Sequence, residues 1–402
     1  MDSKDYLSRT ESGKRQRFKN KISFTIIIAL VVVACTFAIV IYIKTDKTVP
    51  TGTPVNVKDS KLEEESDVQK EQPEQPQAQV QTQPNTETTI KISAAGDFTL
   101  GTDETFTYPD TFVRTASANG LAYFVQELDN IFQEDDLTTV NLETTLTNST
   151  QKAEKTFRFK GDPGYAEILK LGGIEAVNLA NNHIHDYLQK GYTDTIEALK
   201  NQQIGYFGYE NQYITTIKDV KIGALGFEGW QDTREVRNKV SQGISQLREQ
   251  GAQIVLVHFH WGVERQYVPT ASQKSLARFA IDSGADLIIG HHPHVVQGIE
   301  EYNDKFIVYS LGNFMFGGNR NPSDKDTYVF QQTFHLENGV LTDKKEINVI
   351  PFSISSVSSK NNYQPTRLEG SEYERVKKKI IDVSNKINGT DWLVYDQVIN
   401  EE

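Results

Sequence analysis

Seven of the eight histidines in this sequence fall in three short segments, which are NNHIHD (181–186), HFHWG (258–262) and GHHPH (290–294). Neutral imidazole is a common metal ligand and can also transfer protons near neutral pH. Each segment lies at or just after the end of an apolar run that is typical of a buried strand. Histidines distant in the sequence can therefore converge at one rim of a sheet, where they would form a shared site.

Two acidic segments occupy equivalent places in the sequence. Gly96 and Asp97 end the first apolar run of the folded region, and Asn141 and Glu143 end another. Carboxylate and amide oxygens combined with several imidazoles suit Zn²⁺, Mn²⁺ or Fe²⁺ better than Ca²⁺ or Mg²⁺. The single cysteine, Cys35, excludes both an intramolecular disulfide framework and a cysteine-based zinc cluster.

The elements that must position these side chains alternate between strand and helix patterns. Helical periodicity predicts helices over 121–132, over 191–202 with Thr193 as the cap, and over 272–282. Residues 205–227 and 328–349 resemble antiparallel strands. The pattern predicts an α/β domain with a mixed sheet, or with two sheets packed together and helices on their faces. The other predicted strands cover 90–96, 137–143, 175–181, 254–260, 285–294 and 306–314.

The N-terminal region predicts a membrane anchor. Residues 22–43 contain no charge and are long enough to cross a hydrocarbon core about 30 Å thick. The preceding arm, 1–21, has seven basic and three acidic residues, so we expect it in the cytoplasm and everything after Lys44 outside the cell. A buried helix, a cleaved signal peptide and a lipidated Cys35 are the alternatives. The apolar run continues beyond Cys35, where a lipoprotein would turn polar.

Residues 44–89 contain no aromatic residue and are rich in Gln, Glu, Pro and Thr, which predicts a disordered extracellular linker. We expect the folded domain over 90–355 and a helical extension over 356–402. The net charge of −12 argues against nucleic-acid binding, which usually needs a basic face. It also gives no support for a broad surface that binds anionic polymer.

Seven motifs, in order, resemble the CapA/PgsA capsule-synthesis family over about residues 90–355: GDFTLG, NLETTL, FRFKG, NLANNHIHDYLQKGYTDTIEAL, HFHWGVE, GADLIIGHHPHVVQGIE and YSLGNF. The family is associated with making or exporting poly-γ-glutamate at the cell surface. Its fold is similar to the calcineurin-like metallophosphoesterases, in which a two-sheet sandwich is flanked by helices. The resemblance therefore implies a partner complex in the membrane and contact with an anionic polymer.

The resemblance also implies roles for single residues. Glu143 or Asn141 stands where phosphoesterases have a metal-bridging carboxylate, and His183 resembles their proton donor or oxyanion partner. Phosphoesterases usually have histidine where this chain has Thr99, which leaves open whether one or two ions bind. The metal ligands implied by position are Asp97, Asn182, His258, His292 and His294.

Other polar residues near the motifs are candidates for supporting roles. Asp186 could fix the tautomer of a neighbouring imidazole or cap the next helix. His185, His260 and His291 have no clear counterpart in the phosphoesterases. Candidate substrate contacts, which could equally be ordinary solvated polar groups, are Glu264, Arg265, Lys160 and Asn313.

Two functions are compatible with these residues. In the first, a divalent metal lowers the pKa of bound water towards neutrality, and the site hydrolyses a phosphoester or cleaves or transfers an isopeptide bond. Asn182 would orient the reacting group and His183 would protonate the leaving oxygen. In the second, the anchored domain binds emerging polymer or scaffolds the synthesis complex without catalysis. The role shared with the family, an outer component of capsule synthesis, is the function we expect.

Overall fold

The computed structural model describes residues 86–400. The predicted arm, the predicted membrane span over 22–43 and the predicted linker up to residue 85 lie outside this range. Within residues 86–400, none of the helices combines the length and the apolar character needed to cross a membrane. The first strand begins at Glu87, three residues before the predicted start of the folded domain.

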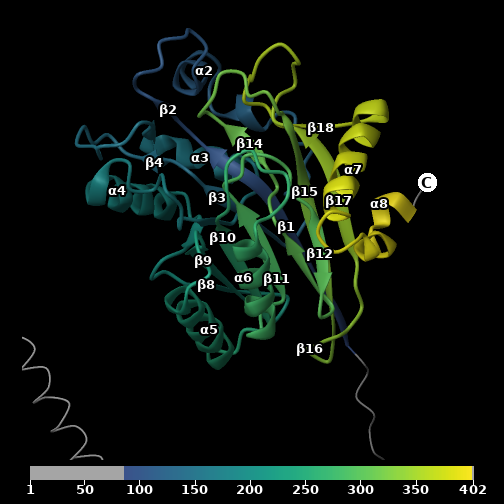
Figure 1. The fold of residues 1–402 in the computed structure, drawn as a ribbon. Helices are drawn as coiled ribbons and strands as arrows, with labels where there is room; N and C mark the ends of the chain where they lie inside the picture. The colour runs from purple at the N-terminus through teal and green to yellow at the C-terminus, as the bar shows by residue number, and fades with distance from the viewer. Residues whose placement is uncertain (1–85, 401–402) are drawn as a thin grey trace, which may run out of the picture. The chain divides into compact units, whose positions relative to one another are not determined.

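Two mixed sheets form the centre of the folded region (Figure 1). The first has nine strands, and parallel pairing joins β1, β3, β6 and β7, whereas β15 and β17 run antiparallel to their neighbours. Its strands are β1 (Glu87–Thr99), β3 (Leu137–Leu142), β6 (Ala176–Asn178), β7 (Gly205–Phe207), β14 (Asn313–Phe316), β15 (Asp326–Glu337), β16 (Val340–Leu341), β17 (Ile347–Ser353) and β18 (Thr366–Arg367).

The second sheet has six strands in the order β12-β13-β11-β10-β9-β8, with antiparallel pairs only at its two edges. These are β8 (Tyr213–Ile217), β9 (Val220–Glu228), β10 (Ile254–His260), β11 (Leu287–His291), β12 (Ile299–Tyr302) and β13 (Lys305–Val308). A small third sheet contains β2 (Thr102–Asp103), β4 (Thr145–Leu146) and β5 (Phe159–Gly161). The prediction of an α/β domain with mixed sheets is confirmed.

Side-chain alternation along the strands builds the layers. In β10, Ile254 and Leu256 pack in a core that joins residues of both large sheets. Val255 and Val257 point the opposite way and pack under α5 (Arg234–Glu249) and α6 (Ala271–Asp282). Period-two alternation of a fully apolar strand thus supplies two separate cores.

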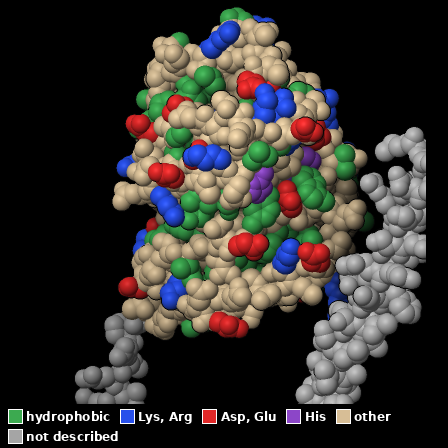
Figure 2. All heavy atoms as spheres, turned by 90° about the vertical axis from the view of Figure 1, so that its left-hand side faces the viewer, with side chains coloured by type: hydrophobic (Ala, Val, Ile, Leu, Met, Phe, Trp, Pro, Cys, Tyr) green, Lys and Arg blue, Asp and Glu red, His purple; other side chains and the backbone are tan. Residues whose placement is uncertain are grey.

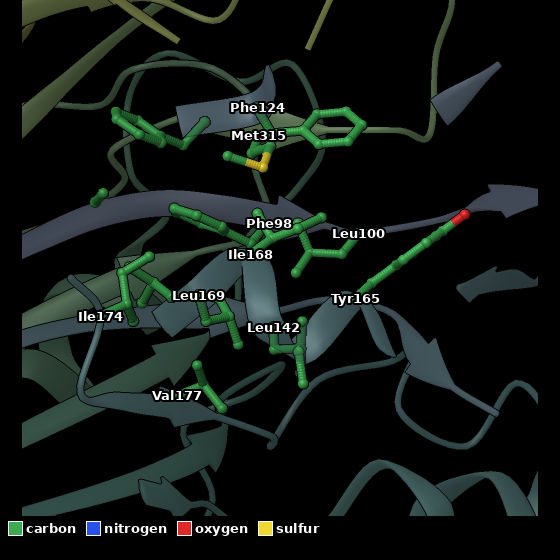
Figure 3. Close-up of a cluster of buried hydrophobic side chains, with 14 of the residues drawn as sticks. Phe98, Leu100, Phe124, Leu142, Tyr165, Ile168, Leu169, Ile174, Val177 and Met315 are labelled. Carbon is green, nitrogen blue, oxygen red and sulfur yellow. The ribbon is translucent and has the colours of Figure 1, made fainter. Parts of the chain in front are cut away.

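A third core covers the outer face of the first sheet (Figure 3). Val177 of β6 and Leu142 of β3 pack there against Ile168 and Leu169 of α3 (Ala166–Leu171). The remaining helical segments near this face are α2 (Phe112–Asn119), η1 (Ala122–Val125), η2 (Pro163–Tyr165) and α4 (Leu188–Asn201).

The C-terminal segment belongs to the same folded unit. β18 pairs with β17, and α7 (Gly370–Ser384) packs beside β17 (Figure 1). Val376 and Ile380 of α7 join the core between the large sheets, together with Trp392 of η3 (Asp391–Tyr395). The chain continues into α8 (Gln397–Asn400). Residues 356–400 therefore complete the core.

Two local predictions were wrong. The segment 121–132 forms only the short η1 followed by turns, and the left-handed backbone conformations of Asp129 and Asn130 exclude a helix continuous to residue 132. Thr193 does not cap α4, which begins at Leu188. Position 191 lies inside this helix, and it is occupied by glycine because a Cβ there would lie 2.5 Å from the Thr145 side chain.

Candidate metal centre

The core between the two large sheets becomes polar at the carboxyl ends of the central strands. In β10, the positions that carry Ile254 and Leu256 are continued by His258 and His260, which are both buried. In β11, the same alternation leads from Ile289 to His291. Side chains of one parity face one side of a strand, so these imidazoles lie between the two sheets at one end.

Six side chains form three overlapping groups that could hold a metal ion. Glu143, His260 and His292 form the first group, and Asp97, Glu143 and His294 form the second. Glu264 joins His292 and His294 in the third. Within each group the ligand atoms lie within 4.8 Å of one another. Because Glu143, His292 and His294 each belong to two groups, the six residues make one connected cluster, which we call the metal cluster.

Asp97 anchors the cluster from β1. The register of β1 against β3 shifts at this residue, and its carboxylate is fully buried. Oδ1 accepts a hydrogen bond from the Asn141 amide at 2.9 Å, and Oδ2 lies 3.3 Å from His294 Nδ1. The preceding residue must be glycine, because a Cβ on Gly96 would come within 2.1 Å of the Gly312 carbonyl oxygen.

Glu143 provides the test of whether these residues suit a metal. Its carboxylate is fully buried, and among the described residues neither oxygen has a hydrogen-bond partner. Oε1 lies 3.5 Å from His260 Nε2, 3.9 Å from His294 Nε2 and 4.0 Å from His183 Nε2. Ligands of one ion, each roughly 2.1 Å from it, lie about 3.4 Å apart at a tetrahedral angle. A buried carboxylate without donors is costly, and a cation would satisfy it.

The protonation states of the cluster also suit a cation. Burial raises the pKa of Glu143 well above its usual range. Burial lowers the pKa of His294, but the charges of Glu143 and Asp97 outweigh this effect and raise it to about 9. Burial, together with the charge of His294, lowers the pKa of His292 to about 3. A metal bound by these groups would compete with protons for them, so its affinity should depend on pH.

The backbone is strained where the closing histidines lie. His292 has a φ of 95° and His294 a φ of 56°, and Arg265 in the facing loop has a φ of 62°. Residues other than glycine rarely adopt these conformations, which cost on the order of 1–3 kcal/mol each. Such strain is concentrated at functional sites, where the surrounding contacts hold it in place.

His258 and Asn141, both predicted as ligands, take other positions. His258 Nδ1 lies 2.9 Å from His291 Nε2, and His258 Nε2 lies 3.1 Å from the Thr139 hydroxyl. Both ring nitrogens therefore point away from the three groups, and His260, one pleat further along β10, reaches the cluster. The oxygen of Asn141 accepts from Asn178 and Asn181 while its amide donates to Asp97. Asn141 therefore links Asp97 to Asn178 and Asn181 through hydrogen bonds and does not take the place of a metal ligand.

Asn182 and His183 of the NNHIHD segment lie beside the metal cluster. Asn182 Oδ1 lies 2.9 Å from His260 Nε2. His183 Nδ1 lies 2.7 Å from Asp186 Oδ2, which leaves Nε2 facing Glu143. Asp186 therefore fixes the tautomer of His183, not of His185. The other Asp186 oxygen accepts from the ammonium of Lys155 at 2.6 Å.

The remaining predicted residues divide between the cluster and its surroundings. Asn313 Oδ1 lies 2.9 Å from His294 Nδ1, so it orients that ring. His291 Nδ1 lies 3.3 Å from Asp97. His185 points away and packs against Tyr192 and Tyr209. The Lys160 ammonium bonds the Ser149 carbonyl and lies over the Tyr187 ring rather than at the cluster.

Three functional candidates escaped the sequence predictions. The indole of Trp230 stands edge-on to His292, with ring centroids 4.7 Å apart, and its side chain is 40% exposed. Trp230 lies two residues after the end of β9, so its place near a strand end was a usable signal. Lys155 and Phe159 come from an irregular segment and from β5, and no periodicity marked them. Figure 2 shows histidines reaching the surface among hydrophobic and acidic side chains.

A cavity of about 440 Å³, which we call the aromatic cleft, opens beside His183 and His294. Its volume lies in the range of small-molecule sites. Glu264 and Arg265 stand at the end near the metal cluster, and Arg320 also lines the cleft. The rings that line it are those of Phe106, Tyr108, Phe157, Phe159 and Phe316.

Comparisons with known proteins agree on one family. A family model described as "Bacterial capsule synthesis protein PGA_cap" matches residues 91–318. The "Capsule biosynthesis protein CapA" of Bacillus anthracis is 34% identical over 235 residues, which cover 52% of this chain and 55% of that protein. The "PGA biosynthesis protein CapA" of Bacillus subtilis (strain 168) is 30% identical over 249 residues, covering 56% of this chain and 63% of that one.

The matched regions thus span between half and two thirds of these relatives. Among solved structures, a hypothetical protein from Thermus thermophilus is similar with a TM-score of 0.41 and 15% identity. The alignment covers 65% of this chain and 99% of that one.

Proposed function

Because the chain belongs to the bacterial capsule synthesis protein family PGA_cap, we propose that it is an outer-surface component of capsule polymer synthesis or export. The polymer is of the poly-γ-glutamate type, because PGA is part of the description of the family and of the name of the Bacillus subtilis relative. Residues 22–43 anchor the chain in the cell membrane by a single span, with the N-terminus in the cytoplasm. Its partners are the membrane complex that makes the polymer and the anionic polymer itself.

The proposed fold type is that of the calcineurin-like metallophosphoesterases, a two-sheet sandwich flanked by helices. Two features support this proposal. The two large sheets share one apolar core, and helices cover their outer faces. The polar cluster lies at the carboxyl ends of the central strands, where open α/β sheets place their ligand sites.

The buried, unpartnered carboxylate of Glu143 carries the proposal of a metal site. The residues that would hold one or two ions of Mn, Fe or Zn are Asp97, Glu143, His260, His292 and His294, with Glu264 at the open side. A divalent metal bound there supplies Lewis acidity towards a phosphoryl or carbonyl oxygen and lowers the pKa of water at the site.

The protein side chains around the cluster supply positioning and proton transfer. Asp186 holds His183 through Nδ1, so Nε2 faces the space beside Glu143. Burial lowers the pKa of His183, so Nε2 is unprotonated at rest and would take a proton from the attacking water before giving it to the leaving oxygen. Lys155 fixes this arrangement by donating to Asp186 and to the Asn182 carbonyl. The Asn182 side chain, held by His260, can orient the reacting group. The arrangement suits hydrolysis of a phosphoester or an amide-type bond.

The first test is the metal content of the full-length chain purified without chelator, beside the double variant His292→Ala/His294→Ala. One or two equivalents of Mn, Fe or Zn in the native chain, lost in the variant, would support the proposal. No metal above background in a folded native chain would contradict it. A strain carrying His183→Ala then separates the two functions, since a catalytic site loses capsule polymer whereas a scaffold does not.

The alternative function is a metal-dependent phosphoesterase that acts on another envelope substrate. The cleft beside the cluster favours it, because a hydrolase needs a pocket for the group next to the scissile bond. A strain that makes no poly-γ-glutamate but needs Asp97 and His183 for normal envelope growth would support this alternative.

A further inference from the structure

The aromatic cleft is lined by a continuous row of rings that begins at the metal cluster. His294 and Phe316 have ring centroids 5.1 Å apart, and Phe316 and Phe159 lie 6.4 Å apart. The row continues from Phe159 to Phe157 at 6.5 Å and from Phe157 to Phe106 at 6.3 Å. The row of rings therefore leads from the metal cluster along the cleft, whose lining also includes the polar side chains of Asn319, Arg320 and Asp324.

Most polar side chains along this row already have partners. Asp324 accepts from Tyr267 and Lys379, and the guanidinium of Arg320 is paired with Asp110. The side-chain oxygen of Asn319 accepts from the backbone of Asn321. The Asp324 carboxylate and the side-chain oxygen of Asn319 are therefore engaged, and Arg320 uses its Nε in the pair with Asp110. The faces of the rings are the apolar surface that the cleft offers beside these groups.

Arg265 differs from these residues. Among residues 86–400, its side chain makes no hydrogen bond or ion pair, although its backbone N–H donates to the Pro293 carbonyl at 2.8 Å. It stands next in sequence to Glu264, which approaches His292 and His294. An uncommitted guanidinium beside a metal cluster suits one anionic group, which it can bind in bidentate fashion.

The outer edge of the cleft is also apolar. The side chain of Phe157, which lines the cleft, is 51% exposed. Burial of such a ring against an apolar ligand is favourable in proportion to the area removed from water. Exposed apolar groups that line a ligand cleft indicate a contact site rather than chance exposure.

We propose that the aromatic cleft binds the apolar body of an amphipathic anion, whose single phosphate-type group lies between Arg265 and the metal cluster. The ligand class is the phosphate ester of an alkyl, polyprenyl or aryl alcohol, and not a chain with a carboxylate on every unit. This inference rests on the metal site of the proposed function and names a ligand class for it.

The test is calorimetric binding of methylphosphonate and of butyl-, hexyl- and octylphosphonate, below their micelle-forming concentrations, to the metal-loaded full-length chain. Affinity is expected to rise about fourfold per added methylene until the cleft is filled. Equal affinity for methyl- and octylphosphonate would overturn the proposal. So would tighter binding of a γ-linked glutamate octamer than of octylphosphonate.

Two variants with matched controls locate the ligand. Phe157→Ala should lower the ratio of octylphosphonate affinity to methylphosphonate affinity at least fivefold and leave methylphosphonate affinity unchanged. Val340 is exposed in β16, and Val340→Ala should change neither quantity. Arg265→Ala should lower the affinity for all four phosphonates about equally, roughly tenfold. Arg234 is exposed at the start of α5, and Arg234→Ala should leave these affinities unchanged. If Phe157→Ala binds octylphosphonate like the native chain, the assignment of the apolar body to the cleft is wrong.

The two proposals fail separately in this experiment. Absence of metal in the native chain contradicts the proposed function before any phosphonate is added. Metal that is present, with phosphonate binding that ignores chain length, contradicts only the inference about the cleft.

Discussion

At the residue scale, the carboxylate of Glu143 is the feature with the clearest chemical consequence. It is buried among imidazoles that are too far away to donate hydrogen bonds to it. The natural partner for such a group is a cation shared with those imidazoles. Metal binding and folding stability should therefore be linked through this residue.

Removal of metal is expected to lower the melting temperature of the native chain but not that of Glu143→Gln. A ligand at a free concentration 100 times its Kd raises the free energy of unfolding by about 2.7 kcal/mol. The variant loses the central carboxylate of the cluster, and its amide carries no charge that must be neutralised. Thermal melts with and without chelator measure both values.

The control for this measurement is Glu167→Gln, a change at an exposed carboxylate in α3 that should respond to chelator as the native chain does. A native melting temperature that chelator leaves unchanged would contradict the expected link between metal and stability.

A second residue-scale prediction concerns pH. Burial raises the pKa of Glu175 to about 7, from an ordinary value of 4.5. Between these values the folded state retains a proton that the unfolded state has lost, so stability falls as pH rises through this window. Glu175→Gln should make the fall shallower, as measured by urea unfolding from pH 4.5 to 7.5. It should not abolish it, because burial also raises the pKa of Asp135 to about 6.

Glu167→Gln again serves as the control for the pH measurement, because its exposed side chain should leave the native slope unchanged. A slope for Glu175→Gln that matches the native slope would show that the Glu175 carboxyl titrates no differently in the folded and unfolded states.

At the element scale, the C-terminal segment is held by one buried ion pair. Lys377 of α7 donates to Asp396 and, at 2.8 Å, to the Val349 carbonyl of β17. Asp396 also accepts from the Val349 backbone at 3.3 Å. These contacts join α7, β17 and the segment after η3. The position of α7 thus depends on polar contacts as well as on its apolar face.

Lys377→Met is expected to lower the free energy of unfolding by about 3–5 kcal/mol, because it leaves the buried Asp396 carboxylate without its cation. The double variant Lys377→Met/Asp396→Leu should recover part of this loss. Chemical denaturation of the three proteins measures it. The matched control is Lys378→Met, which removes an exposed pair with Asp382 and should cost less than about 1 kcal/mol. An equal cost for both lysines would show that burial of the pair is unimportant.

At the scale of the whole molecule, the proposed role requires the folded domain to face the outside of the cell. In intact cells, added protease should remove an epitope tag at the C-terminus and spare one at the N-terminus. Cys35→Ser should stay in the membrane fraction, because the apolar run rather than a lipid holds the chain. A protected C-terminal tag would contradict the proposed orientation, and release of Cys35→Ser would favour lipidation.

The sequence by itself determined which strands end in polar residues and hence where the site would lie. Side-chain direction along a strand is a local property, so the alternation that buries Ile254 and Leu256 also directs His258 and His260 towards the first sheet. The same local rules predicted the α/β class, the strand that is β10 and the helix over 272–282 that is α6. They failed over 121–132, where the apolar spacing predicts a helix but the chain forms η1 and turns, with left-handed residues at Asp129 and Asn130.

Only the tertiary structure decided which of these side chains meet. His258 and His260 share a face, but the depth of each between the sheets depends on how β10 pairs with β9 and β11, and only His260 reaches Glu143. Asn141 and Glu143 are two residues apart, yet packing of Asn178 and Asn181 commits the first to hydrogen bonds. Lys155 joins the site from a loop, whose position follows from long-range packing that no local pattern encodes.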